Sequence, residues 1–60
     1  MDINLYLEDF DNSELQGYDW WEQMKDAVDQ YNSNYNKELP STASINAYIN
    51  WRRRKNTPDM

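Results

Sequence analysis

The residues of this 60-residue chain that could do chemistry are mainly carboxylates, because it contains no cysteine and no histidine. Residues 9–13 (Asp-Phe-Asp-Asn-Ser) place oxygen atoms at alternate positions, as a calcium-binding loop does where it begins. Such a loop also needs a glycine at position 14 and an acid at position 20, where this chain has Glu14 and Trp20. The sequence therefore predicts no metal site, and without cysteine it predicts no disulfide.

The sequence also lacks the residues that enzyme active sites commonly use. Paired carboxylates catalyse acid–base reactions in a walled pocket that separates their pKa values, and 60 residues offer little material for one. Nucleophilic catalysis relies on an activated side chain for which Cys and His are the usual parts. The only glycine, Gly17, is too little for a phosphate-binding loop. We expect a non-enzymatic protein without a cofactor.

Charge is divided steeply along the sequence. Residues 1–30 hold nine acids and one base, Lys25, whereas residues 39–60 hold four bases and one acid, Asp59. The net charge of the whole chain is −5. Because net charge governs partners and solubility rather than fold, the acidic half is the main functional signal.

The acidic half predicts a surface that binds a basic protein. Carboxylates spaced along a surface can occupy the places where a nucleic-acid-handling protein holds phosphates, and aromatic neighbours can serve as anchors. We interpret the chain as a small inhibitor or modulator of such a protein, of the kind that phages and mobile elements encode. A merely solubilising face is the plainer alternative. The predicted partner-binding residues are Glu8, Asp9, Asp11, Glu14, Asp19, Trp20, Glu22, Asp26 and Asp29, with Tyr6 and Phe10 as further aromatic contacts.

The basic cluster consists of Arg52, Arg53, Arg54 and Lys55. Arginine suits phosphate geometry, so a small DNA-binding regulator is an alternative function. A net charge of −5 would repel a duplex, however, unless the acidic half points away from it. We favour a helix end that pairs with acids of the same or another copy, and a self-associating assembly component is the third alternative. A gel shift at low salt separates an inhibitor from a DNA-binding regulator.

The first residues allow more than one structure. Ile3, Leu5 and Leu7 alternate with polar residues, which is typical of a half-buried strand. No second strand follows, so a strand here would need another chain to pair with. The sequence leaves an extended arm, a short strand and a short helix open for residues 3–8.

An amphipathic helix over residues 20–36 is the clearest predicted element. Its apolar positions follow a 3-4-3-4 spacing. Asp19 is expected to cap it, with Glu22 reaching back as in a capping box. The stripe consists of Trp21, Met24, Val28, Tyr31 and Tyr35, and the first four are predicted core residues.

Pro40 should end that helix, because proline disfavours helix in the preceding residue. Ser41 or Thr42 can then cap a second helix over residues 42–54, with Ile45 and Tyr48 in its apolar stripe. The predicted fold is mainly α and forms a single domain. It comprises an acidic arm (1–18), a helical hairpin (19–55) and a tail (56–60).

Size and hydropathy complete the prediction. A core this small rarely supplies more than about 3–5 kcal/mol, so we expect a homodimer. No apolar run approaches 18 residues, and the start lacks the basic and apolar regions of a secretory signal. A cytoplasmic protein is therefore expected, in the host cytoplasm if it is phage-encoded.

Overall fold

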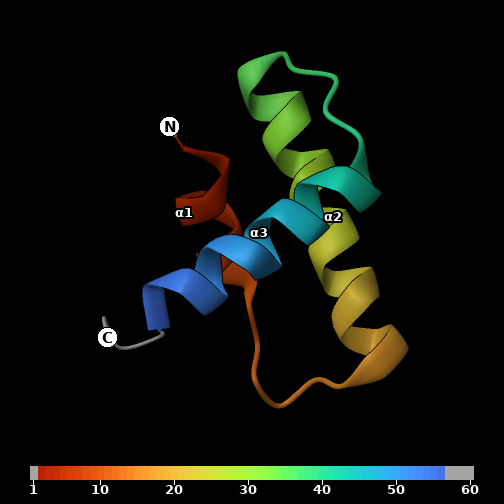
Figure 1. The fold of residues 1–60 in the computed structure, drawn as a ribbon. Coiled ribbons are helices and arrows are strands. Elements are labelled where there is room, and N and C mark those ends of the chain that lie inside the picture. The colour runs from red at the N-terminus through yellow and green to blue at the C-terminus, as the bar shows by residue number, and fades with distance from the viewer. Residues whose placement is uncertain (1, 57–60) are drawn as a thin grey trace.

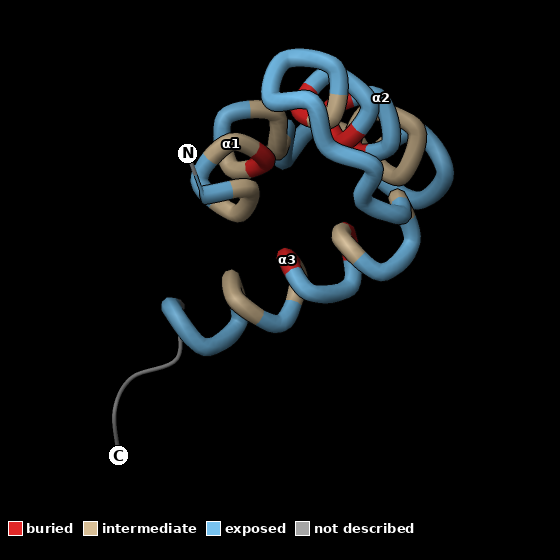
Figure 2. Tube along the Cα trace, turned by 90° about the horizontal axis from the view of Figure 1, so that it is seen from above, coloured by how far each residue is buried: buried red, intermediate tan, exposed pale blue. Residues whose placement is uncertain are grey.

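Three helices make up the computed structural model, which describes residues 2–56: α1 (Ile3–Phe10), α2 (Gly17–Tyr35) and α3 (Ser41–Asn56). Helix α1 lies beside the later half of α2, and α3 crosses α2 and reaches past the end of α1 (Figure 1). Seen from above, α1 and α2 lie together and α3 runs along the opposite side (Figure 2). The mainly α prediction is confirmed, and the described residues contain no strand.

Helix α1 resolves the alternatives for the first residues in favour of a short helix. The Asp2 carboxylate caps it by accepting a hydrogen bond from the Asn4 amide at 3.0 Å. Leu7 is buried, and Ile3 and Phe10, four residues before it and three after, pack against the same core. The strand and extended-arm alternatives are wrong, because residues 3–10 form a helix that places Ile3, Leu7 and Phe10 on one face against the core.

Helix α2 begins at Gly17, three residues before the predicted start. Gly17 has a φ of +59°, a left-handed conformation that glycine adopts without strain. The residue before it, Gln16, occupies the cap position and makes no side-chain cap bond. Asp19 therefore lies inside the first turn, where it complements the helix dipole. The predicted Asp19–Glu22 capping box is wrong.

The side chain of Asn32 holds the connection between α2 and α3 through two hydrogen bonds to the backbone. Asn32 accepts from the Leu39 amide at 3.1 Å and donates to the Leu39 carbonyl at 3.0 Å. Asn36 has a φ of 55° and ends α2 in a left-handed cap. Helix α3 then starts at Ser41, one residue before the predicted start. The α2–α3 pair matches the predicted order of helices, but the structure is a three-helix arrangement rather than a hairpin with an arm.

The core joins all three helices. Met24, Val28, Tyr31 and Ile45 are buried, as predicted, whereas Trp21 is half-buried at its edge. The further buried residues are Leu7, Ala27 and Tyr48.

An aromatic cluster fixes α1 to α2. The ring of Tyr6 lies 5.3 Å from the rings of both Phe10 and Tyr31 and 6.2 Å from that of Tyr35. Its hydroxyl accepts a hydrogen bond from the Asn34 amide at 3.0 Å. Tyr6 and Phe10 are thus partly buried in internal packing, which leaves less of each ring for the predicted contact with a partner.

Candidate functional site

The Asp11 carboxylate is the polar centre of the structure. It accepts hydrogen bonds from the Trp20 indole at 2.8 Å, from the Tyr48 hydroxyl at 2.5 Å and from Arg52. Asp11 is the residue that ends α1, Trp20 belongs to α2, and the other two donors belong to α3. Only 12% of the Asp11 side chain is exposed. One carboxylate therefore connects the three helices.

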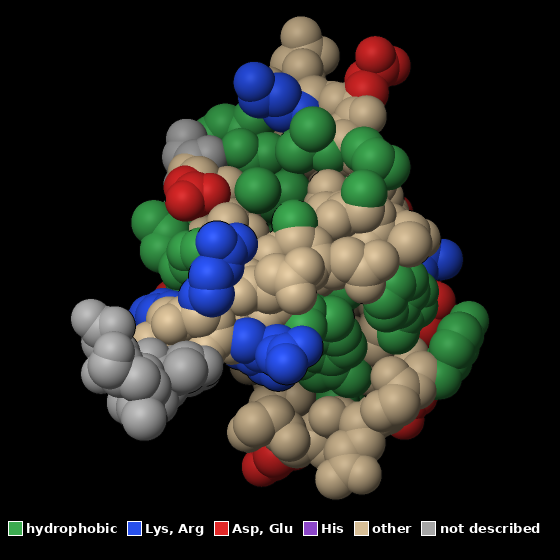
Figure 3. Space-filling model, viewed as in Figure 1, with side chains coloured by type: hydrophobic (Ala, Val, Ile, Leu, Met, Phe, Trp, Pro, Cys, Tyr) green, Lys and Arg blue, Asp and Glu red, His purple; other side chains and the backbone are tan. Residues whose placement is uncertain are grey.

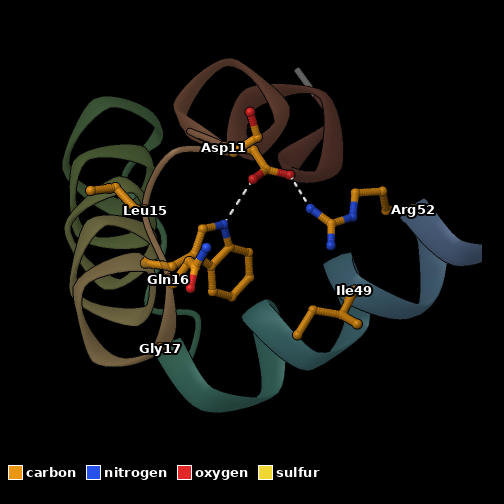
Figure 4. Close-up of a pocket in the computed structure, with 8 residues that line it drawn as sticks. Asp11, Leu15, Gln16, Gly17, Ile49 and Arg52 are labelled. Carbon is orange, nitrogen blue, oxygen red and sulfur yellow. Dashed lines mark hydrogen bonds and ion pairs between the residues drawn. The ribbon is translucent and has the colours of Figure 1, made fainter.

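The Arg52 guanidinium has aromatic neighbours as well as its ion pair. It lies 5.8 Å from the ring centres of both Trp20 and Tyr48, within cation–π range. A pocket of about 510 Å³ opens beside it, between the 11–17 connection and Ile49 of α3. Figure 4 shows Asp11 joined directly to Arg52 and to the Trp20 indole where they line this pocket. The cation is neutralised by Asp11, so the pocket presents no unpaired charge to a ligand.

The protonation states of this cluster are fixed around neutral pH. Burial acts to raise the pKa of Asp11, but the hydrogen bonds from Trp20, Tyr48 and Arg52 outweigh it and lower the pKa. Burial, with the bond to Asp11, raises the pKa of Tyr48. The hydrogen bond to Asp11 raises the pKa of Arg52. None of the three groups exchanges a proton near neutral pH, so the cluster supports structure rather than acid–base catalysis.

A second ion pair reinforces the contact between α1 and α3. Lys55 donates to the Glu8 carboxylate at 2.6 Å, and its ammonium lies 4.9 Å from the ring centre of Trp51. With the Arg52–Asp11 pair, two of the four basic residues bind acids of the first eleven residues of the same chain. This is the internal pairing that we favoured for the basic cluster. Arg53 and Arg54 are exposed.

Four acids lie on the outer side of α2, three of them exposed and Glu22 partly exposed. We call the acidic ridge the set Asp19, Glu22, Asp26 and Asp29, which recur at three- and four-residue steps and so share one face of the helix. The buried residues Met24, Ala27, Val28 and Tyr31 lie on the opposite face. Lys25, 3.7 Å from the Glu22 carboxylate, is the only base within this segment of α2.

The predicted partner-binding residues therefore fall into two groups. Glu8, Asp11 and Trp20 are engaged in contacts that hold the helices together. The four residues of the acidic ridge, together with Asp9 and Glu14 outside α2, have side chains in contact with solvent.

The structure adds Tyr18, an aromatic residue of the acidic half that was not among the predicted partner-binding residues. It is the most exposed large apolar side chain described, at 72%. Four residues separate it from Glu22, so it flanks the acidic ridge. The predicted start at Trp20 left Tyr18 outside the helix and hid this relationship.

Two kinds of feature are not found in the part of the chain that the structure describes. Within residues 2–56, no three acidic side chains stand close enough to hold a metal ion, and no helix has the length and apolarity to cross a membrane.

The sequence matches no protein-family model, and comparison with curated proteins and with solved structures gives no match. The function must be argued from the residues themselves.

Proposed function

We propose that this chain is a small non-enzymatic protein that binds a basic partner protein through the acidic ridge. The supporting observation is the position of the ridge: four carboxylates in about three turns of α2 face away from the core that holds the helix. Their exposure leaves them able to meet a partner without disturbing the fold. An inhibitor or modulator of a nucleic-acid-handling protein remains the class of function we propose.

The charge density of the ridge supports this class of partner. At a rise of about 1.5 Å per residue, Asp19 and Asp29 lie about 15 Å apart along the helix axis. The four acids thus present one charge per about 5 Å, compared with one per about 3.4 Å along each strand of duplex DNA. A protein surface built to hold a phosphate backbone would meet a comparable row of negative charge.

Folding gives a reason for Asp19, which complements the helix dipole, but none for the other three acids of the ridge. Glu22 and Asp26 are four residues apart, where like charges destabilise a helix by a few tenths of a kcal/mol. Lys25 offsets only part of this repulsion, because its pair with Glu22 is exposed and such pairs contribute little. Tyr18 beside the ridge provides the kind of aromatic anchor that interfaces use.

A capture experiment tests the proposal. Tagged protein is exposed to lysate of its source or host at low salt, and retained proteins are identified by mass spectrometry. The Glu22→Lys/Asp26→Lys variant should lose a basic nucleic-acid-handling protein that the unaltered chain retains. The matched control sets the single variant Asp26→Lys against Glu38→Lys, which changes the net charge equally at an exposed position outside α2 that is not among the predicted partner-binding residues. Loss with both single variants, or with none of the three, would contradict a role for the ridge.

The proposed homodimer is a separate matter. Exposed apolar side chains that a second copy could cover are Leu5, Tyr35 and Leu39, between 37% and 46% exposed. Sedimentation equilibrium at 10–200 µM measures whether the chain dimerises, and a monomer throughout would remove that part of the proposal.

A further inference from the structure

The outer face of α3 differs from every other surface described. It carries amides, small side chains and arginines at three- and four-residue steps, all of them exposed. We call this set the α3 outer face: Ala43, Asn46, Ala47, Asn50, Arg53 and Arg54. The residues that anchor the helix, Ile45 and Tyr48, point the other way into the core. We propose that the α3 outer face is a second binding surface, separate from the acidic ridge of α2, and that it binds duplex DNA by lying in the major groove. Because the two surfaces lie on different helices, DNA binding tests the α3 outer face alone and the capture experiment tests the acidic ridge, so the gel shift no longer excludes a partner protein.

The charge of α3 suits this ligand. The helix has no Asp or Glu along its length and ends in four consecutive bases. Two of these, Arg52 and Lys55, turn inward to Asp11 and Glu8, which leaves Arg54 exposed at the end of the outer face beside Arg53. Figure 3 shows Lys and Arg side chains along the region where the end of α3 lies, with others at the top and right edge, and acidic side chains mainly at the edges of the view.

The acidic ridge does not oppose such binding, because it lies on the far side of α2. Helix α3 packs against the buried face of α2, and the ridge is on the opposite face of that helix. Packed helices are about 8–10 Å apart, and each adds a radius of about 5 Å, so roughly 20 Å separate the two outer faces. That is about two Debye lengths at physiological salt and about one at 20 mM salt, so the repulsion from the acidic ridge is largely screened at physiological salt and reduced at 20 mM.

The side chains of the face match groups in the groove. The major groove is about 12 Å wide and admits a helix of this diameter. Asparagine pairs with adenine through two hydrogen bonds, which suits Asn46 and Asn50, and arginine binds guanine or phosphate. Ala43 and Ala47 are small enough for the backbone to approach closely. Figure 2 shows α3 alone on its side of the molecule, so neither α1 nor α2 blocks a duplex there.

Fluorescence anisotropy with a labelled 20-base-pair duplex at 20–200 mM salt tests the inference. The protein should bind with micromolar affinity at low salt. Arg54→Glu should weaken binding at least tenfold and make the salt dependence shallower by about one phosphate contact. Its matched control is Lys25→Glu, which changes the net charge equally but lies on α2 (side chain 45% exposed) and should alter the affinity less than twofold.

A second variant tests the amides without changing charge. Asn46→Ala/Asn50→Ala should keep the helix, since alanine favours it, and should weaken duplex binding several-fold. Duplex RNA of the same sequence should bind more weakly, because its major groove is too narrow for a helix. The inference is overturned if no binding occurs at 20 mM salt and 100 µM protein, if Lys25→Glu weakens binding as much as Arg54→Glu, or if duplex RNA binds equally well.

Discussion

The Tyr48 hydroxyl donates a hydrogen bond to the Asp11 carboxylate across 2.5 Å and joins residues 37 positions apart in the sequence. Tyr48 is fully buried, and Asp11 lies at the end of the first helix. The same carboxylate binds Trp20 and Arg52. Because the chain has no disulfide and a small core, this polar centre should carry an unusual share of its stability.

Replacing the Asp11 carboxylate by an amide should destabilise the fold. In Asp11→Asn, the amide N–H₂ would face at least one of the three donors, and the charge of Arg52 would lose its partner. Charge-assisted hydrogen bonds contribute about 1.5–3 kcal/mol, so we expect a loss of about 2 kcal/mol and a Tm about 10 °C lower. Asp9→Asn, at an exposed neighbouring position, should change stability by less than about 0.5 kcal/mol. Urea unfolding followed by circular dichroism measures both.

The pH dependence of stability should reveal the same carboxylate. The pKa of Asp11 is lower in the folded chain than its ordinary value of 3.8. Asp11 therefore stabilises the fold above that value, and this contribution is lost as pH falls through the folded pKa. We expect the stability difference between the unaltered chain and Asp11→Asn to be constant from pH 7 to 5 and to shrink below pH 4. A difference independent of pH down to 2.5 would show that ionised Asp11 is not the stabilising form.

The core between α2 and α3 should not tolerate a charged side chain. Val28 and Ile45 have no exposed surface, so an aspartate at either position buries an unpaired carboxylate at a cost of several kcal/mol. That matches or exceeds the stability expected of a domain this small. Val28→Asp and Ile45→Asp should both be unfolded at 25 °C by circular dichroism. Ala43→Asp, on the exposed face of α3, should remain folded.

The Asn32 side chain should matter more than its exposure suggests. It forms both a donor and an acceptor contact with the Leu39 backbone and so fixes the turn that leads into α3. We expect Asn32→Ala to cost about 1 kcal/mol. Asn46→Ala should be neutral or slightly stabilising, because Asn46 is exposed and alanine favours the helix. Equal effects in urea unfolding would indicate that the turn does not depend on Asn32.

The parts of the fold that follow from local spacing could be predicted from the sequence. The α2 stripe places Met24, Val28 and Tyr31 in the core, and Pro40 separates α2 from α3 close to where the structure does. Helix α1 was harder to predict, because the spacing of Ile3, Leu5 and Leu7 suggests the alternation of a strand. In the structure the packed face consists of Ile3, Leu7 and Phe10, and Leu5 is exposed. A few residues fit both periods, and only tertiary packing decides between them.

The polar centre could not be predicted, for a different reason. Asp11 meets Tyr48 and Arg52 across 37 and 41 residues, and no local pattern shows which of many acids a distant arginine will bind. The same ambiguity placed Trp20 among the residues expected to contact a partner, although its indole N–H is used inside the molecule. The acidic ridge itself was visible from sequence, because Glu22, Asp26 and Asp29 share a helical face.

The most direct test of the proposed function is the salt dependence of affinity for the partner obtained by capture. Titration calorimetry at 50, 150 and 300 mM salt would compare the unaltered chain with Glu22→Lys/Asp26→Lys, after circular dichroism has shown equal helicity. If the acidic ridge is the binding surface, affinity should fall at least tenfold over this range, because complementary exposed charges are screened by salt. The variant should show no measurable binding at any of the three concentrations. Affinity that is insensitive to salt, or that survives the double charge reversal, would contradict the proposal.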